Sequence, residues 1–329
     1  MRDISPERVW LAPMSGSTDA AFRRQAIRFG AEAVVSEMVA GEALTAARPD
    51  MVRRICRHEG AGRWIVQLAA RRPEDMKAGA RLLAEAGVDQ IDINMGCPSR
   101  QVTGGQSGSA LMREPDLAQR IMDAALEGGG GLPVSLKMRL GWDHDALNAP
   151  TLAQYAERAG ICMVFVHGRT RCQFYKGEAD WAQIADTKDA VTIPVIANGD
   201  ISDPASAQQA LELSGADGVM IGRAAMGRPW LLGSVSASLN NNDNWTWPDV
   251  PEQLDSLVSQ IEDSLSLYGA ALGLKIVRKH ISAAIDHLDR PWHSDARREA
   301  RSTICQLSSA DAVVEALQDV YLKDRRLAA

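Results

Sequence analysis

Short runs of β-branched and aliphatic residues recur along the chain as far as Ile221, and segments with helical periodicity separate them. The eight runs are Val9–Ala12, Ala33–Ser36, Trp64–Leu68, Gln90–Asn94, Pro133–Lys137, Met163–His167, Pro194–Asn198 and Gly218–Ile221. Eight parallel strands, each followed by a helix, can close into a barrel. The sequence therefore predicts an α/β fold, a (β/α)8 TIM barrel.

The segments between the runs support helices, and the alternative fold lacks its signature. Amphipathic patterns cover Pro73–Ala86, Thr151–Ala159 and Asp203–Leu213, and a glycine follows each of them, at 87, 160 and 215. The rival is a doubly wound open sheet, which binds a dinucleotide through a G-x-G-x-x-G turn after its first strand. That turn is missing after Val9–Ala12, so the barrel is favoured.

The pattern changes after the eighth run, and this change predicts a second domain. Residues 241–251 are polar, with two prolines and two tryptophans, and they read as a linker. Three or four helices follow, within the segments 252–271, 274–289, 294–308 and 310–322. We therefore predict a catalytic barrel over residues 1–240, a linker over 241–251 and a small all-helical domain over 252–329.

Composition excludes several classes of protein. Apolar residues make up 46% of the 329 residues and charged residues 24%, as in soluble globular proteins, and no apolar run approaches a membrane span. The first residues lack a signal-type apolar stretch, which predicts a cytoplasmic protein. The five cysteines are widely spread without a C-x-x-C pair, so we expect neither a disulfide framework nor a metal site. A net charge of −6 argues against indiscriminate coating of nucleic acid.

Polar residues follow nearly every predicted strand. These strand-end residues are Pro13, Met14 and Ser15, Glu37, Gln67, Asn94 and Cys97, Lys137 and Arg139, His167 and Arg169, Asn198, Gly199 and Asp200, and Gly222 and Arg223. In a barrel of this type the carboxyl ends of the strands form the active-site face. The sequence therefore predicts a crowded polar site at one rim of the barrel.

Two of these groups suggest ligands. The segments Asn198–Asp200 and Gly222–Arg223 follow adjacent strands, where backbone N–H groups and an arginine commonly hold a phosphate, unless the glycines only turn the chain. Lys137 is costly to bury without an anionic partner, such as a flavin ring or a substrate carbonyl; a Schiff-base lysine is the alternative. His167 ends the neighbouring strand and contacts cofactor phosphate or substrate, or else is a core histidine.

Cys97 is the cysteine most suited to chemistry. It lies in a loop between Gly96 and Pro98, and the glycine-rich stretch 103–108 downstream predicts a mobile loop that closes over a substrate. A thiol at the rim can act as a nucleophile or as a general acid. The alternative is a structural cysteine.

These residues carry a resemblance to a known family. The chain resembles the tRNA-dihydrouridine synthases at Leu11–Asp19, Val35–Met38, Ile91–Pro98, Gly108–Leu111, Val166–Arg171, Ile196–Asp200 and Val219–Ala224, which span the barrel in order. The motifs N-M-G-C-P at Asn94–Pro98 and H-G-R-T-R at His167–Arg171 are the most specific. The resemblance implies an FMN-dependent enzyme that uses NADPH to reduce uridines of tRNA.

The resemblance also implies residue roles. FMN is expected against Pro13, Met14 and Ser15, with Gln67 and Lys137 at the polar edge of its ring. Phosphate contacts are expected from His167, Asn198, Gly199, Asp200, Gly222 and Arg223. FMN passes hydride to C6 of uracil, and the Cys97 thiol protonates C5. Asn94 is expected at the uracil edge, and Arg139 and Arg169 at phosphates or the base.

The C-terminal helices resemble the tRNA-binding domain of the family. Lys275, Arg278 and Lys279 fall on one helical face, at i, i+3 and i+4. We expect them to contact tRNA; the alternative is a charged helix face that is only exposed to solvent. Ser282, Ala283 and Ala284 stand where the family suggests a Trp-Tyr pair, which leaves the modified tRNA position open. The alternative functions are a flavoenzyme acting on a free pyrimidine and a phosphate-binding barrel without redox activity.

Overall fold

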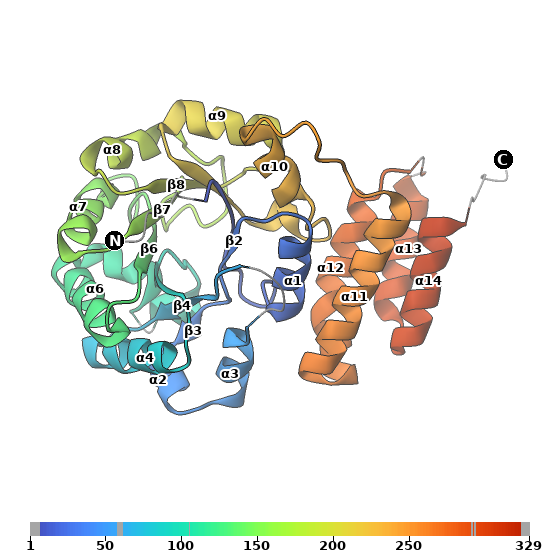
Figure 1. Cartoon of the computed structure of the whole chain (residues 1–329), viewed down its shortest axis with the longest axis horizontal. Helices are drawn as coiled ribbons and strands as arrows, with labels where there is room; N and C mark the ends of the chain where they lie inside the picture. The colour runs from blue at the N-terminus through green and yellow to red at the C-terminus, as the bar shows by residue number, and fades with distance from the viewer. Residues whose placement is uncertain (1–6, 58–61, 105, 291, 293, 324–329) are drawn as a thin grey trace.

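A computed structural model describes residues 7–57, 62–104, 106–290, 292 and 294–323, and its larger part is a barrel of parallel strands (Figure 1). The strands are β1 (Val9–Leu11), β2 (Ala33–Val34), β3 (Val39–Ala40), β4 (Ile65–Ala69), β5 (Gln90–Met95), β6 (Val134–Arg139), β7 (Met163–His167), β8 (Val195–Asn198) and β9 (Gly218–Ile221). Their order in the sheet is β2-β1-β9-β8-β7-β6-β5-β4-β3. The predicted TIM-barrel fold is confirmed.

A parallel bridge between Val35 and Ile65 closes the ring, because it joins the end of β2 to the start of β4. The Ser36 N–H donates to the Ile65 carbonyl at 3.0 Å beside this bridge. The short strand β3 then pairs with the end of β4. The strand predicted at Ala33–Ser36 is therefore present as β2 and the bridge at Val35, and β3 adds a short strand beyond the predicted one.

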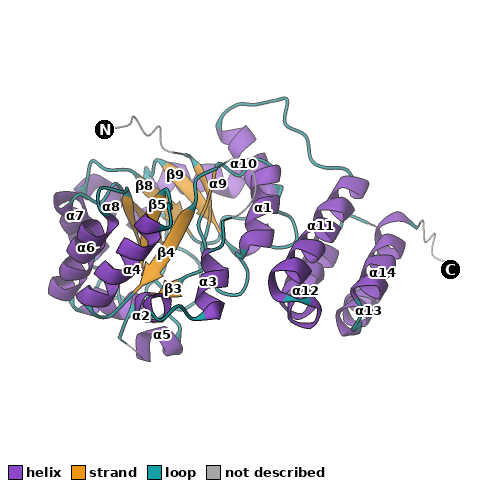
Figure 2. Ribbon diagram, turned by 60° about the horizontal axis from the view of Figure 1, so that its bottom comes forward, coloured by secondary structure: helices purple, strands orange, loops and turns teal. Residues whose placement is uncertain are grey.

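Helices surround the barrel on its outer side (Figure 2). They are α1 (Ala20–Arg28), α2 (Gly41–Thr45), α3 (Pro49–Ile55), α4 (Pro73–Glu85), α5 (Arg100–Gly104), η1 (Gly108–Arg113), α6 (Pro115–Gly129), α7 (Ala149–Ala159), α8 (Ala182–Ala190), α9 (Pro204–Ser214), η2 (Arg223–Ala225) and α10 (Leu231–Leu239). The helices predicted after the third, fifth and seventh runs correspond to α4, α7 and α9. Gly160 and Gly215 end α7 and α9 in the left-handed conformation, as their positions predicted.

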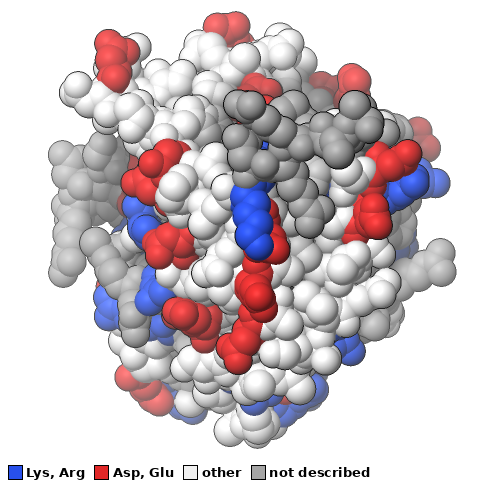
Figure 3. Space-filling model, turned by 90° about the vertical axis from the view of Figure 1, so that its right-hand side faces the viewer, with Lys and Arg blue, Asp and Glu red and all other residues white. Residues whose placement is uncertain are grey.

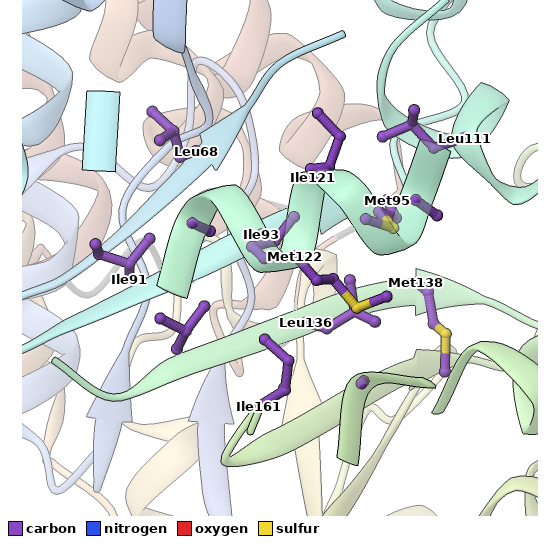
Figure 4. Packing of buried hydrophobic residues seen from close by; sticks show 14 of the residues in the cluster. Leu68, Ile91, Ile93, Met95, Leu111, Ile121, Met122, Leu136, Met138 and Ile161 are labelled. Atoms are coloured by element: carbon purple, nitrogen blue, oxygen red, sulfur yellow. The ribbon is translucent and has the colours of Figure 1, made fainter. Parts of the chain in front are cut away.

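Alternation along the strands decides which side chains enter the barrel. Figure 4 shows Ile91, Ile93 and Met95 of β5 packed with Ile121 and Met122 of α6 in the outer core. Since successive residues of a strand point to opposite faces, the residues between those of β5 point into the barrel. Hydrogen bonds between strands that are not neighbours, such as β6 and β8, confirm this arrangement for the interior.

The interior has an apolar part and a polar part. The apolar cluster includes Trp10, Phe165, Ile196 and Met220, which are fully buried. The polar set consists of Gln67, Asp92, Asn94, Ser135, Lys137, Arg139, His167 and Asn198. Asn94, Arg139, His167 and Asn198 stand at or next to the carboxyl ends of their strands, and the other four lie deeper in the barrel. The barrel therefore places part of its buried polar chemistry at the predicted rim.

The C-terminal part of the chain is helical, as expected. It contains α11 (Val250–Tyr268), α12 (Ala270–His287), α13 (Ser294–Gln306) and α14 (Ala310–Leu322). Helix α11 begins two residues earlier than predicted because Asp249 and Glu252 form a capping box around its first turn. The connector between α10 and α11 overlaps the linker predicted at 241–251. Within the described part of the chain, no helix combines the length and apolar character that a membrane span requires.

The helical region packs against α1 of the barrel (Figure 1). The ring of Phe22 lies 4.4 Å from the ring of His280, measured between centroids, and both side chains are buried. Arg24 pairs with Asp263 at 2.7 Å, and the Ser256 hydroxyl donates to the Gln25 amide oxygen at 3.1 Å. Apolar and polar contacts thus fix the helices beside the amino-terminal segment of the barrel.

Candidate active site

Lys137 is a half-buried cation inside the barrel. Its Nζ donates to Asn198 Oδ1 at 2.9 Å, and the Asn198 amide nitrogen donates to the Met220 carbonyl at 2.7 Å. Burial lowers the pKa of Lys137 to about 8, and the nearby Arg139 guanidinium adds to this effect, whereas Asp92 opposes it. A lysine with this pKa holds a proton at neutral pH and stands ready for an anionic or carbonyl partner.

His167 and Arg169 carry buried nitrogen atoms that lack a hydrogen-bond partner within the described residues. These atoms are Nδ1 of His167 and Nη1 of Arg169. Burial, reinforced by Arg139 and Lys137, lowers the pKa of His167 well below its ordinary value, so the imidazole is neutral. Because buried polar groups are normally paired, these two nitrogens mark a place where a polar ligand fits.

The loop after β8 holds Asp200 between two arginines. The Asp200 carboxylate accepts hydrogen bonds from Arg169 Nη2 and from the Ala179 N–H, and it lies 3.5 Å from Arg223 Nη2. Asp200 has a φ of 55°, a conformation that costs a non-glycine residue energy and is common at functional sites. The Asp200 side chain therefore orients the two arginines, and the phosphate contact expected of Asp200 stays a prediction.

Gly199 allows this loop to pass close to His167. Its φ is 116°, and a Cβ atom at this position would lie 2.8 Å from the Ala179 side chain and 3.4 Å from His167 Nε2. Only glycine tolerates both the backbone conformation and the close approach. The predicted segment Asn198–Asp200 therefore adjoins His167 in the structure, and its Asp200 lies 3.5 Å from Arg223 of the other predicted segment.

Cys97 lies half-buried in a loop whose backbone is fixed on both sides. Asn94 Oδ1 accepts from the N–H groups of Gly96 and Cys97, at 3.2 and 3.0 Å. The Ser109 hydroxyl donates to the Cys97 carbonyl at 2.8 Å, and Arg139 Nε donates to the Gly96 carbonyl at 2.8 Å. These contacts hold the thiol-bearing loop at the rim.

The Cys97 thiol keeps its proton at neutral pH. Burial raises its pKa, and the backbone at Ser99 and the cations Arg139 and Lys137 only partly oppose this effect. A protonated thiol suits a general acid better than a nucleophile. The predicted glycine-rich loop forms the end of α5 and the start of η1, and Gly105 lies outside the described residues.

The segment Pro13–Ser15 enters the same rim from β1. The Met14 N–H donates to the Thr18 hydroxyl at 2.8 Å, and the Glu37 carboxylate accepts from the Gly16 N–H. A Cβ atom built on Gly222 would lie 3.5 Å from Met14 Sδ, so the ends of β1 and β9 adjoin. Ser15 is exposed, whereas Pro13 and Met14 are half-buried.

Three residues that sequence reasoning did not select belong to this rim or its support. Asp92 and Ser135 lie inside the barrel and hydrogen-bond to each other at 2.7 Å. Tyr175 is 56% exposed, and the guanidinium groups of Arg139 and Arg223 lie 5.6 and 5.1 Å from its ring centre. Strand alternation could have revealed Asp92 and Ser135, because both fall on the inward parity of their strands.

The basic residues predicted on α12 do not share one environment. Lys275 is exposed, Arg278 Nη2 donates to the Leu307 carbonyl at 2.9 Å, and Lys279 Nζ donates to the Gly16 carbonyl. Next to it, His280 Nε2 donates to the Ser17 carbonyl at 3.0 Å. Two of the three expected tRNA contacts therefore also make contacts within the protein. On the end of the molecule drawn in Figure 3, acidic and basic side chains are interspersed among the described residues.

Together, the fold and the rim define a (β/α)8-barrel protein with buried cations, a neutral histidine and a protonated thiol at the carboxyl ends of its strands. Residues 10–323 match the family model described as dihydrouridine synthase (Dus). The chain therefore belongs to the dihydrouridine synthase family. No group of three or more His, Cys, Asp or Glu residues that could hold a metal ion occurs in the described ranges.

Relatives of similar length support this membership. The chain is 47% identical over 311 residues to a probable tRNA-dihydrouridine synthase of Rhodobacter capsulatus, covering 94% of this chain and 96% of that protein. It is 44% identical to a probable tRNA-dihydrouridine synthase of Rickettsia conorii, covering 94% and 92% of the two chains. It is 40% identical to the tRNA-dihydrouridine synthase B of Xanthomonas axonopodis, covering 97% and 93%.

Proposed function

We propose that this protein is an FMN-dependent, NADPH-driven enzyme that reduces the C5=C6 bond of specific uridines in tRNA to 5,6-dihydrouridine. The single observation that carries the proposal is a protonated, half-buried Cys97 thiol, held on the same rim as the half-buried cation Lys137. Reduction of the C5=C6 bond adds a hydride and a proton: the thiol would supply the proton, and the cation would stabilise negative charge on the flavin that supplies the hydride. The names of the relatives support tRNA as the substrate.

The residues at the rim fit a flavin mononucleotide. Lys137 and Gln67 provide polar contacts for the ring edge, and Pro13, Met14 and Ser15 provide a surface for its face. The unpartnered His167 Nδ1 lies in the region assigned to the phosphate, which in our proposal is also bound by Asn198, Gly199, Gly222 and Arg223. Asp200 contributes by orienting Arg169 and Arg223.

Bound FMN, once reduced by NADPH, supplies the hydride that is added to C6 of uracil. Cys97 completes the reaction, because addition at C6 leaves an enolate that the C4 carbonyl stabilises and the thiol proton is transferred to C5. Asn94 contacts the uracil edge, and Arg139 and Arg169 hold the base or the adjoining phosphates. The target uridine must leave the RNA stack to reach this rim.

The C-terminal helices contribute to tRNA binding in this proposal. Lys275 is exposed for an electrostatic contact with the phosphate backbone.

A comparison of substrates tests the proposal. The purified protein is expected to be yellow, with flavin absorption, and to oxidise NADPH in the presence of unmodified tRNA with formation of dihydrouridine. Free uridine and free uracil are the matched controls, and we expect no comparable turnover with either. Turnover on the free base alone would identify a free-pyrimidine enzyme, and a colourless protein that binds no flavin would contradict the redox assignment.

A further inference from the structure

A chain of hydrogen bonds connects the Cys97 loop to the interior of the barrel. The N–H groups of Gly96 and Cys97 donate to Asn94 Oδ1. Asn94 Nδ2 then donates to Gln67 Oε1 at 2.7 Å, and Gln67 Nε2 donates to Asp92 Oδ2 at 2.7 Å. This rim chain runs from the thiol-bearing loop through two buried amides to one carboxylate.

The direction of every bond in the rim chain is determined. A backbone N–H can only donate, so the oxygen of the Asn94 amide must face the loop and its nitrogen must face Gln67. The Gln67 amide must therefore turn its oxygen to Asn94 and its nitrogen to Asp92. An inverted amide at either position would bring two donors or two acceptors together.

A second chain reaches Asp92 from the opposite side. Arg63 Nη1 donates to Gln90 Oε1 at 3.0 Å, and Gln90 Nε2 donates to the Ser135 hydroxyl at 2.9 Å. That hydroxyl donates to Asp92 Oδ1 at 2.7 Å. Because an arginine also can only donate, all bonds of this lower chain likewise point toward Asp92.

Asp92 is the one residue of these chains that accepts from both sides. Its side chain is fully buried, and an ionised carboxylate is the side-chain group that offers acceptors alone. Burial raises the pKa of Asp92 to about 6, and the bonds from Gln67 and Ser135 and the charge of Lys137 oppose this rise. The carboxylate is therefore ionised at neutral pH.

We propose that Asp92 is a positioning residue for the Cys97 loop: it fixes the Gln67 amide and, through Gln67, the Asn94 amide that binds the backbone of Cys97. The role in catalysis rests on the proposed function, but the effect on the loop does not. Gln67 and Asn94 are two of the groups assigned to cofactor and base, so a single buried carboxylate sets the orientation of both.

Two variants separate the chains, because Asp92→Ala breaks the bonds on both sides of Asp92 and Ser135→Ala breaks the lower one only. Asp92→Ala leaves the Gln67 amide nitrogen without an acceptor, whereas Ser135→Ala removes the 2.7 Å bond to Asp92 on the lower side only. Asp92→Asn is the conservative variant, because it can keep an oxygen toward Gln67 while its nitrogen donates to Ser135. The first readout is the alkylation rate of Cys97 in the flavin-free full-length protein, followed by peptide mass spectrometry, with the exposed Cys172 as internal reference.

We expect Asp92→Ala to raise the alkylation rate of Cys97 relative to Cys172 roughly fivefold, the change in an equilibrium that one ordinary hydrogen bond supports. Ser135→Ala and Asp92→Asn should stay near the wild-type rate. In tRNA reduction, Asp92→Ala should lower kcat on the order of 10²-fold with little change in KM, as misplacement of a reacting group does.

Equal alkylation rates in Asp92→Ala and Ser135→Ala, or no change in either, would overturn the proposal. If Asp92→Ala does not fold, Gln67→Met breaks the same rim chain with Asp92 in place, and the same increase is expected. If Asp92→Ala raises the alkylation rate of Cys97 but the wild-type protein does not reduce tRNA, the proposed function is rejected and the positioning role is kept.

Discussion

The charge of Lys137 and its surroundings decide which kind of ligand can bind beside it. Among the residues that the structure describes, its Nζ has one hydrogen-bond partner, the Asn198 amide oxygen, and its neighbour Arg139 is another cation. Burial without a full counter-charge is the reason that its pKa falls to about 8. A ligand that offers negative charge or a carbonyl oxygen here is bound best while Lys137 keeps its proton.

The affinity of the flavin-free protein for FMN should therefore depend on pH. We expect the affinity to be constant below pH 7.5 and to fall as the pH rises through about 8, because Lys137 loses its proton in the free protein there. Titration of FMN by fluorescence quenching between pH 6.5 and 9.5 measures this. In Lys137→Met the decline should be absent, and an equal decline in both proteins would exclude Lys137 as its source.

Helix α12 of the C-terminal region contacts the segment that follows β1 of the barrel. Lys279 and His280 donate to the consecutive carbonyls of Gly16 and Ser17, next to the residues assigned to the flavin. The helix that carries the predicted tRNA contacts thus also holds one edge of the rim. Lys275 lies one turn away and is free of such contacts within the described residues.

Lys275 and Lys279 should accordingly differ when each is replaced by alanine. Lys275→Ala is expected to weaken tRNA binding and to reduce the slope of affinity against salt by about one. Lys279→Ala should leave the slope unchanged and weaken FMN binding, since the Gly16 carbonyl loses its partner. Binding measured at several salt concentrations checks this, with Lys77→Ala on α4 as control; a reduced slope in Lys279→Ala would show a direct RNA contact.

The sequence predicted strands and strand ends well because both follow from local patterns. Met163–His167 and Gly218–Ile221 match β7 and β9 residue for residue, and the rim residues followed from them. The break between β2 and β3 was not predicted, since it involves contacts between segments far apart in the sequence, such as the bond from the Gly16 N–H to Glu37. The three basic residues of α12 share a face by periodicity, but tertiary contacts that no local pattern encodes engage two of them.

The stability of the folded protein depends on a buried histidine, His280, that stays neutral. His280 is 2% exposed, lies against Phe22 and donates to the Ser17 carbonyl, so it joins the helical region to the barrel. Burial, with a smaller effect of Lys279, lowers its pKa to about 3. In the unfolded chain the pKa returns to its ordinary value of about 6.5. The unfolded state therefore binds the proton first as the pH falls.

This difference predicts acid sensitivity that one substitution should remove. The contribution of His280 to stability is complete above pH 6.5 and is lost as the pH falls toward 3, which amounts to about 2 kcal/mol between pH 7 and pH 5. His280→Gln keeps a donor for the Ser17 carbonyl but does not titrate. Urea unfolding of both proteins at pH 7 and pH 5 should show the smaller loss in His280→Gln; equal losses would contradict a neutral His280.

In the proposed mechanism, Cys97 delivers a proton to a uracil that receives hydride on the same rim. Single-turnover reoxidation of NADPH-reduced enzyme by unmodified tRNA tests it most directly, with flavin absorbance and dihydrouridine both followed. We predict that Cys97→Ala binds FMN and is reduced by NADPH as the wild type is, while its reoxidation by tRNA is slower by roughly 10²- to 10⁴-fold. Reoxidation at the wild-type rate, with dihydrouridine formed in equal amount, would contradict the claim.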